Sequence, residues 1–391
     1  MTFKSISVCL IFFALLGQAS FAQKLETRQV GIFPELSVFQ YGPAGNDLIS
    51  FYHDELYWLH SNGRPMQLDN DSLDLFVLKD SNLEYVQTLQ VPVDRNLSKL
   101  TGFGLTDSFL FVTDYNIVLV YVKTNSKYEL FEVIDAVNGV TTMTGKYGSF
   151  EDWVETKDFI YTTDFHVDNT CEGGCKDMFI GKIDKKSLLL VDSFTLKTCG
   201  NIMAQINSHK PFDFSPSGNL MARVDLPSNR LEIYKPALHA LSLFSTCDRD
   251  SLYPNAIHAD SISIWTDVYQ FGPQKIHQDY WRKITSDVIQ SDQIMGIKFL
   301  SDSLLLIRRV QNTVLHFDLL NVYSEAYFYL ETPTQLIGQK WENHMMCVHD
   351  GKLYVLFPNK VIEDQQGVWK EQGHTINSIQ GWRLVEVSIH E

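Results

Sequence analysis

The chain has 391 residues and a formal net charge of −15 at neutral pH, with 45% apolar and 13% aromatic residues. This composition supplies enough apolar surface for a large core and excludes an intrinsically disordered chain. The acidic balance disfavours nucleic acid and anionic membrane surfaces as partners, because like charges repel.

Residues 1–22 have the regions of a secretory signal. Lys4 supplies the positive start, and Val8–Leu16 form an apolar core that is too short to span a bilayer. Ser20-Phe21-Ala22 place small residues at the positions that a signal peptidase recognises. We therefore predict a mature chain that begins at Gln23, is secreted or periplasmic, and inserts no segment into a membrane after cleavage. Cleavage would remove one lysine and no acidic residue, which changes the formal charge from −15 to −16.

The first predicted element of the mature chain is Gln29–Tyr41, an apolar stretch that we expect to form a strand closing a ring or leading into one. From there a short pattern recurs, an acidic or glycine turn followed at once by an apolar strand. These turns contain Asp54, Asp107, Asp158, Gly218, Asp260, Asp302 and Asp350, at intervals of 42 to 60 residues. Such a period is typical of β-propeller blades. A helical solenoid would need amphipathic helices, and we find almost none in the sequence.

The clearest unit runs from His209 to Cys247 and contains four short apolar segments separated by turns. Ser215–Asn219 is predicted to be a turn, because proline presets φ and glycine accepts positive φ. The predicted strands are Phe212–Phe214, Leu220–Leu226, Leu231–Tyr234 and Leu241–Phe244. Four strands within about 40 residues make one propeller blade.

We predict an all-β fold, a single β-propeller of seven blades over residues 23–391. The strand Arg383–Ile389 is placed to pair with the N-terminal strand, which would close the ring and protect its edges. The unit after Asp260 shows little alternation of apolar and polar residues. The alternative is therefore six blades with an insertion near residues 250–295.

The segment Phe214–Ala222, with the sequence FSPSGNLMA, resembles the turn-and-strand signature of TolB-type propellers. The whole mature chain resembles the secreted propeller proteins of unassigned function that are common in bacterial cell envelopes. This resemblance implies a propeller fold and an exported location. It implies no catalytic residues.

Five cysteines remain after the predicted signal. Cys171 and Cys175 flank a tight loop, and in an oxidising compartment we expect a local disulfide between them. Cys347 lies in an apolar segment and is predicted to be free and buried. The pairing of Cys199 and Cys247 stays open.

Two metal sites were considered and not adopted. Thiolates and an imidazole in the segment His166–Asp177 could bind zinc, but a disulfide with polar flanking residues is favoured in an exported chain. Asp69–Asp74 has carboxylates suited to calcium but lacks the glycine and distal glutamate of a closed loop. We therefore predict no metal and no cofactor.

A ligand is expected at one mouth of the central channel, on the loops that join the outer strand of one blade to the inner strand of the next. These loops carry aromatic and cationic residues suited to a protein, peptide or carbohydrate ligand. The candidate ligand-binding residues are Trp341, His344, His209, Tyr147, Trp153 and Arg95. Trp153 and Trp341 could instead be wedges between blades, and the two histidines could simply bond to the backbone.

The sequence contains no G-x-S-x-G, H-E-x-x-H or C-x-x-C-H motif. We therefore favour an exported, non-catalytic binding or scaffolding module and assign no catalytic residue. The alternative is a propeller-type hydrolase or lyase with its active site at a channel mouth. A histidine and a carboxylate held together at the mouth would favour the enzyme, whereas an aromatic mouth without such a pair would favour the binding module.

Overall fold

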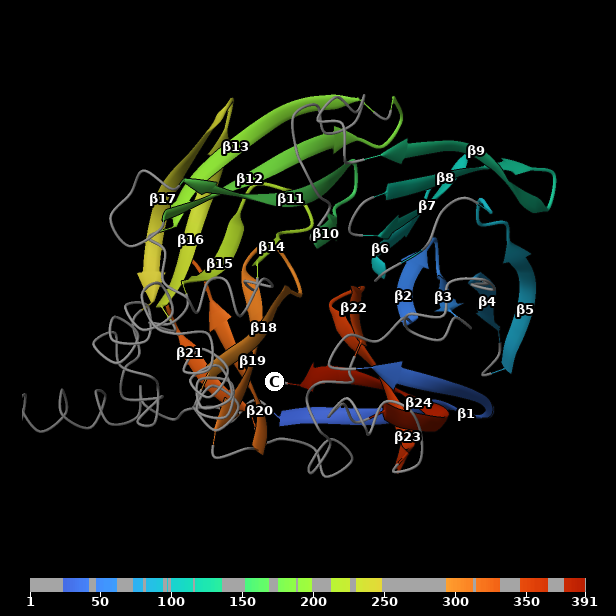
Figure 1. Ribbon diagram of the computed structural model, residues 1–391. Coiled ribbons are helices and arrows are strands. Elements are labelled where there is room, and N and C mark those ends of the chain that lie inside the picture. Colours follow the sequence, from blue (N-terminus) through green and yellow to red (C-terminus); the bar gives the residue numbers. More distant parts are fainter. Residues whose placement is uncertain are drawn as a thin grey trace, which may run out of the picture.

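The computed structural model describes most of the chain outside its longer connecting segments. The described residues are 24–41, 47–61, 73–79, 82–93, 97, 100–114, 117–135, 152–168, 175–187, 189–198, 212–225, 230–247, 293–311, 314–330, 345–364 and 376–390. Every regular element in these ranges is a β-strand, and the strands β1 to β24 form six four-stranded antiparallel sheets (Figure 1). None of the described ranges contains a helix of the length and apolarity needed to cross a membrane.

The first three sheets each use four consecutive strands of the chain. The first blade contains β2 (Asp47–Tyr52), β3 (Glu55–Ser61), β4 (Leu73–Lys79) and β5 (Asn82–Leu89). The second contains β6 (Leu100–Leu105), β7 (Phe109–Asp114), β8 (Ile117–Thr124) and β9 (Lys127–Asp135). The third contains β10 (Asp152–Glu155), β11 (Phe159–Asp168), β12 (Cys175–Asp184) and β13 (Leu190–Thr198).

The next two sheets follow the same rule, and the last one combines both ends of the chain. The fourth blade contains β14 (Phe212–Phe214), β15 (Met221–Asp225), β16 (Arg230–Ala237) and β17 (Ala240–Cys247). The fifth contains β18 (Gln293–Phe299), β19 (Leu304–Gln311), β20 (Val314–Asn321) and β21 (Tyr327–Leu330). The sixth contains β22 (Met345–His349), β23 (Lys352–Asp364), β24 (Ile376–His390) and, as its outermost strand, β1 (Lys24–Tyr41).

The six sheets are arranged radially, with the first strand of each blade nearest the central axis (Figure 1). Inner strands of neighbouring blades contact each other at five of the six seams, and these contacts include β14 with β18. Because these two strands are in direct contact, no further blade stands between the fourth and the fifth. The prediction of seven blades is therefore wrong, and its six-blade alternative is confirmed. The turn predicted at Asp260 belongs to residues 248–292, which lie outside the described residues.

The ring is closed by the pairing of β1 with β24, as predicted from the sequence. The two strands are antiparallel, with Lys24 opposite His390 at one end and Tyr41 opposite Ile376 at the other. An N-terminal strand thereby completes a sheet whose other three strands come from the C-terminus. This arrangement fastens the two ends of the chain together and removes an open edge from the sixth blade.

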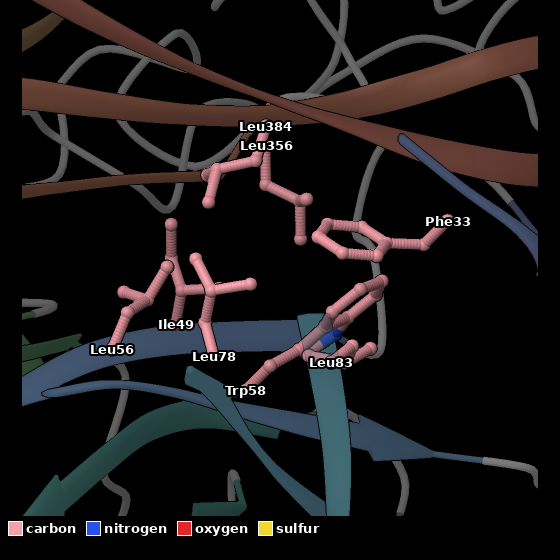
Figure 2. Close-up of a pocket in the computed structure, with 8 residues that line it drawn as sticks. All are labelled: Phe33, Ile49, Leu56, Trp58, Leu78, Leu83, Leu356 and Leu384. Atoms are coloured by element: carbon pink, nitrogen blue, oxygen red, sulfur yellow. The ribbon is translucent and has the colours of Figure 1, made fainter. Parts of the chain in front are cut away.

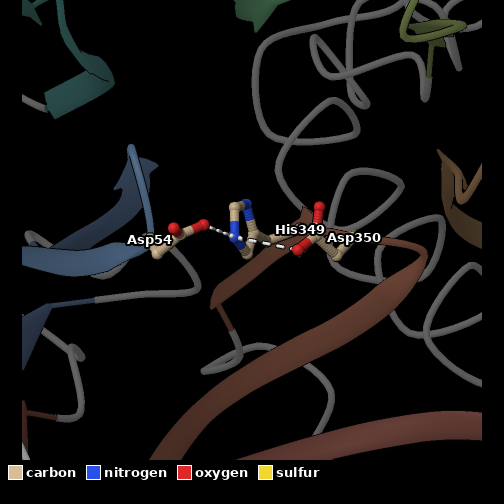
Figure 3. Close-up of side chains that lie close together, drawn as sticks. All are labelled: Asp54, His349 and Asp350. Carbon is tan, nitrogen blue, oxygen red and sulfur yellow. Dashed lines mark ion pairs between the residues drawn. The ribbon is translucent and has the colours of Figure 1, made fainter.

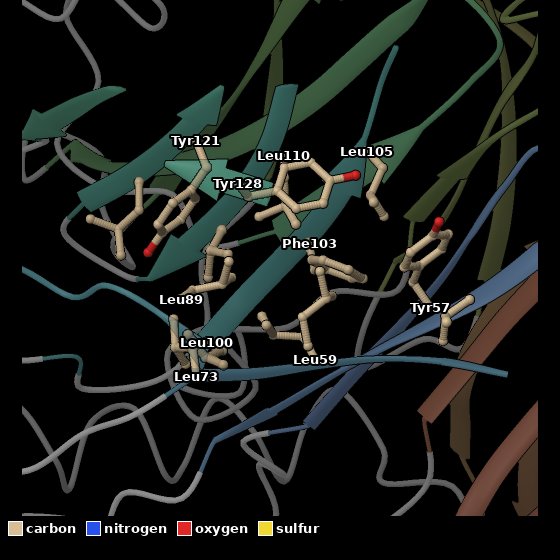
Figure 4. Close-up of a cluster of buried hydrophobic side chains, with 14 of the residues drawn as sticks. Tyr57, Leu59, Leu73, Leu89, Leu100, Phe103, Leu105, Leu110, Tyr121 and Tyr128 are labelled. Atoms are coloured by element: carbon tan, nitrogen blue, oxygen red, sulfur yellow. The ribbon is translucent and has the colours of Figure 1, made fainter. Parts of the chain in front are cut away.

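The core lies between the blades, because each sheet buries both of its faces. Along β7, Leu110 and Val112 pack toward the first blade, whereas the intervening Phe111 packs toward the third. Successive side chains of a strand point to opposite faces, so a strand buried on both faces needs a continuous apolar run. In the described residues, the largest cluster of buried apolar side chains lies at the seam between the first two blades (Figure 4). It includes Leu59, Leu73, Leu89, Leu100, Phe103, Leu105 and Tyr121.

A small apolar cavity lies at the seam between the sixth and first blades (Figure 2). Its volume is about 10 Å³, about the space that one water needs. The cavity is lined by Phe33, Ile49, Leu56, Trp58, Leu78, Leu83, Leu356 and Leu384. Because the lining is apolar, we interpret the cavity as imperfect packing at the ring closure and not as a ligand site.

The outermost strands of five blades carry bulges. The pairing register shifts by one residue where β5, β9, β13, β17 and β1 each meet the neighbouring strand of their blade, and β1 has a second, larger irregularity between Phe33 and Ser37. Bulges twist an edge and interrupt its ladder, which protects exposed edges from pairing with another chain.

Candidate functional site

The residues predicted to bind a ligand fall almost entirely outside the described part of the chain. Trp153 lies in β10, where its backbone pairs with Thr162 of β11. Arg95, Tyr147, His209, Trp341 and His344 lie outside the described residues. The binding surface on the inter-blade loops therefore stays a prediction.

The prediction that Cys347 is free is confirmed, whereas the predicted disulfide between Cys171 and Cys175 is not tested. Cys347, on β22, is free as predicted, and burial raises the pKa of its thiol. Cys247 is the last residue of β17. Cys175 starts β12 opposite Asp168, and Cys171 lies outside the described residues, so the bridge between Cys171 and Cys175 stays a prediction.

In the described residues, carboxylates and imidazoles from different blades lie close together at the end of the channel opposite the inter-blade loops. Each blade has a turn that joins its first strand to its second, here called an inner turn. The inner turns are residues 53–54, 106–108, 156–158, 215–220, 300–303 and 350–351. An inner strand starts at an inter-blade loop and ends at an inner turn. The inner turns therefore ring the channel mouth that faces away from the predicted loops.

Neighbouring inner turns contact one another around this mouth. The Ser217 amide donates a hydrogen bond of 2.9 Å to Asp302 Oδ1, which joins the fourth blade to the fifth. His53 Nε2 lies 3.4 Å from Asp107 Oδ1, which joins the first blade to the second. His349 Nε2 lies 3.4 Å from Asp54 Oδ1, which joins the sixth blade to the first.

His349 lies at the centre of a cluster of side chains whose atoms could bind a metal ion (Figure 3). Its Nε2 is 3.4 Å from Asp54 Oδ1 and 3.6 Å from Asp350 Oδ2. The side chain of His349 is 23% exposed, whereas those of Asp54 and Asp350 are 95% and 80% exposed. The imidazole also stacks on the ring of Phe51 from the first blade, with centroids 4.1 Å apart and planes 6° apart. A partly buried and oriented imidazole thus faces two solvated carboxylates.

The local sequence explains the position of these groups. His349 is the last residue of β22, and Asp350 and Gly351 form a two-residue hairpin loop with φ of 48° and 71°. Two consecutive positive φ angles are typical of the tight hairpin turn that aspartate and glycine favour. The turn therefore presents the Asp350 carboxylate beside the imidazole of the preceding residue.

A second histidine and carboxylate pair lies one blade further around the mouth. Asp107 accepts a hydrogen bond from the Tyr52 hydroxyl and lies beside His53. The hydrogen bond from Tyr52 holds the pKa of Asp107 below its usual range. Desolvation opposes it, and the interaction with His53 adds to the lowering. Asp107 is thus stabilised as an anion by groups of the first blade.

Inside the channel, Glu155 of β10 contacts groups of other strands and blades. Glu155 Oε2 accepts a hydrogen bond of 3.3 Å from Ser50 of the first blade, and Glu155 Oε1 lies 3.1 Å from Lys185 Nζ. Burial raises the pKa of Glu155, and Lys185 and Ser50 offset part of that rise. This carboxyl group can therefore hold a proton more readily than a solvated glutamate.

The cluster of Asp54, His349 and Asp350 is the arrangement in the described residues that could hold a metal ion. Its donor atoms, one imidazole nitrogen and two carboxylate oxygens, all lie within 4.8 Å of one another. In the sequence, the turns at Asp54 and Asp350 indicate only the spacing of the blades. A signal was present nevertheless, because the dipeptide His-Asp occurs in the first turn, at residues 53–54, and again at 349–350.

Comparisons with known proteins identify the fold. No protein-family model and no curated protein matches the chain. Among solved structures, a Bacteroides fragilis protein described as exported matches with a TM-score of 0.50 and 12% identity, over 95% of this chain and 97% of that one. At this identity the likeness shows the propeller fold alone.

Two solved structures described as lactonases also match, at lower scores. The periplasmic gluconolactonase PpgL of Pseudomonas aeruginosa has a TM-score of 0.42 and 12% identity, over 80% of this chain and 81% of that one. A Bacteroides fragilis protein described as a 6-phosphogluconolactonase has a TM-score of 0.42 and 11% identity, over 88% and 91%. The strands in the described part of the chain form a six-bladed β-propeller, and its similarity to TolB-type propellers in particular stays a prediction.

Proposed function

We propose that this protein is an exported binding module whose ligand contacts the ring of inner turns at one mouth of the channel. The observation that carries the proposal is the grouping of Asp54, His349 and Asp350 from the first and sixth blades. Exposed carboxylates beside an oriented imidazole offer several acceptors to a polar ligand. A protein, peptide or carbohydrate that presents hydroxyl, amide or cationic groups has the complementary chemistry.

Two observations support the exported location. Residues 1–22 have the charge and apolar pattern of a secretory signal. The solved Bacteroides fragilis protein of the same fold is also described as exported.

A comparison of the two channel mouths tests the binding site. A thermal-shift screen with peptides and oligosaccharides identifies ligands of the folded protein, because any ligand that binds the folded state alone raises the melting temperature. We expect Asp54→Asn to weaken binding of such a ligand about tenfold or more, since hydrogen bonds to charged groups contribute about 1.5–3 kcal/mol. Trp341→Ala, in a predicted inter-blade loop, should leave the affinity unchanged.

The reverse result would place the site elsewhere. If Trp341→Ala lowers the affinity by about 1–3 kcal/mol, as the loss of interface aromatics does, and Asp54→Asn does not, the ligand binds the inter-blade loops. The inner-turn proposal would then be wrong.

A second candidate function is hydrolysis at the same mouth. The pairing of a histidine with a carboxylate, which would favour an enzyme, is present there, because His349 Nε2 lies beside both Asp54 and Asp350. A carboxylate that orients an imidazole is a common arrangement for a general base. Assays with a panel of esters and lactones test this function. If His349 acts as a general base, His349→Phe should lower kcat about 10²–10⁴-fold. Activity that survives this change would exclude His349 as the general base.

A further inference from the structure

We propose that Asp54, His349 and Asp350 form a zinc site that joins the first blade of the propeller to the last. The inference concerns the same mouth as the proposed function. It is tested without any organic ligand, so the two can fail separately.

The distances between the donor atoms fit a tetrahedral ion. Zinc lies about 2.0–2.1 Å from nitrogen and oxygen ligands, so two ligands at the tetrahedral angle are about 3.3 Å apart. His349 Nε2 is 3.4 Å from Asp54 Oδ1 and 3.6 Å from Asp350 Oδ2. The two carboxylates lie within 4.8 Å of each other, and their exposed side chains can close that gap by small rotations.

The types of ligand atom indicate which metal ion the site would bind. Calcium and magnesium prefer all-oxygen sites, whereas an imidazole nitrogen with carboxylate oxygens suits zinc. Three protein ligands would leave the fourth position of a tetrahedral ion open. A water molecule or a donor atom of the ligand could occupy that position.

The charge balance of the inner turns also indicates a cation at this place. Within the described part of the chain, His349 alone supplies a basic nitrogen beside Asp54 and Asp350, at 3.4 Å and 3.6 Å. The carboxylates of two other turns have further partners, since Asp107 accepts from Tyr52 and Asp302 accepts from the Ser217 amide. With a neutral imidazole the cluster therefore carries two negative charges that a divalent ion would balance.

The scaffold orients the cluster before any ion arrives. Stacking against Phe51 fixes the His349 ring, and the hairpin turn places Asp350 beside it. Asp54 comes from the opposite side of the seam, in the first blade (Figure 3). A bound ion would thus add a link across the seam between the first and sixth blades and stabilise the folded ring.

Isothermal titration of tag-free, metal-free protein with zinc chloride at pH 8 tests the proposal. We expect one zinc per chain, and a melting temperature that rises with zinc concentration. Asp54→Asn and Asp350→Asn each replace an anionic oxygen ligand with a weaker neutral amide. His349→Phe removes the nitrogen ligand, and all three changes roughly keep the shape of the side chain. Each should weaken zinc binding at least about tenfold, since even the loss of a partner that only orients a metal ligand costs 10–100-fold. Calcium should bind at least about tenfold more weakly than zinc.

Asp107→Asn is the matched control, because Asp107 is an exposed carboxylate that also lies beside a histidine of the neighbouring blade. It should bind zinc as the unchanged protein does. The His349→Phe variant should keep its stack on Phe51, so a melting temperature close to that of metal-free wild type shows that it folds. Zinc binding that persists at one per chain in all three variants would overturn the proposal. A loss of binding in Asp107→Asn equal to that in Asp54→Asn would do so as well, because the ions would then bind acidic surface in general.

Discussion

Gly104 is a single residue whose lack of a side chain positions a buried acid. A Cβ at this position would lie 2.6 Å from Glu155 Oε1 and 2.8 Å from Glu155 Cδ. Glu155 is held in place by Ser50 and Lys185, so it cannot move away without breaking both contacts. The glycine on β6 therefore permits a contact between the second and third blades that any larger residue would disrupt.

Gly104→Ala is expected to destabilise the protein by about 1–3 kcal/mol, the usual cost of overpacking. In a Glu155→Ala background the same change should cost less than half as much, because the clashing carboxyl group is gone. Urea unfolding of the four proteins of this double-mutant cycle measures the coupling. Gly296→Ala is a milder control, since its nearest atom would be Arg308 Nε at 3.2 Å. Purely additive effects would show that Gly104 and Glu155 do not interact.

At the scale of elements, buried carboxyl groups form hydrogen bonds with neighbouring strands at two places. The pKa of the carboxyl group is shifted in a different direction at each place. Glu386 of β24 accepts hydrogen bonds from Arg28 of β1 and from Tyr354 of β23. Burial alone would raise the pKa of Glu386, but these hydrogen bonds outweigh it and the pKa is lowered. Asp213 of β14 accepts from the Phe299 amide and from Lys298 of β18, yet burial dominates and its pKa is raised.

The two carboxyl groups are expected to change the stability of the folded protein with pH in opposite directions. A lowered folded-state pKa stabilises the protein above the ordinary value of 4.5 for Glu386, and this contribution is lost as the pH falls through the folded value. Glu386→Gln should therefore cost about 1–3 kcal/mol at pH 7 and progressively less toward pH 3. For Asp213 the unfolded chain ionises first, near 3.8, so wild type should lose stability relative to Asp213→Asn as the pH rises through and above that value.

Urea unfolding at several pH values between 3 and 7 measures both differences. Glu132→Gln, at an exposed position on β9, is the control and should follow wild type throughout. Two variants with the same sign of pH dependence would contradict the assignment.

For the whole molecule, the closure of the ring is the interaction that makes one domain of six blades. Lys24 lies opposite His390 in the antiparallel pair of β1 and β24, so the end of β24 is adjacent to the start of β1. A two-residue Asn-Gly turn could join them as an ordinary hairpin. All four strands of the sixth blade would then be consecutive in sequence.

A circular permutant tests this view of the closure. Joining residue 390 to residue 24 through Asn-Gly, with new ends between residues 140 and 141, should give a protein that melts within about 1.5 °C of the original, which is roughly 1 kcal/mol for a chain of this size. A truncation that lacks residues 24–41 should fail to fold as a monomer, since it leaves the long edge of β24 unpaired. Circular dichroism and gel filtration measure both outcomes. A truncated protein that stays monomeric with an unchanged melting temperature would show that β1 is dispensable.

The strands and the class of fold could be predicted from the sequence because they depend on local chemistry. Alternating or continuous apolar residues and turns rich in aspartate and glycine identify strands and hairpins without reference to the rest of the chain. The predicted strands of the fourth blade and the pairing of Arg383–Ile389 with the N-terminal strand are both present in the structure.

The number of blades and the composition of the site depend on contacts between distant residues, which only the tertiary structure decided. The turn at Asp260 has the same local pattern as the other six, and the direct contact of β14 with β18 shows that no blade stands there. His349 and Asp54 are at opposite ends of the sequence, and they meet only because the sixth blade packs against the first. Local patterns do not specify how many units complete a ring, since closure depends on the geometry of all the seams between blades.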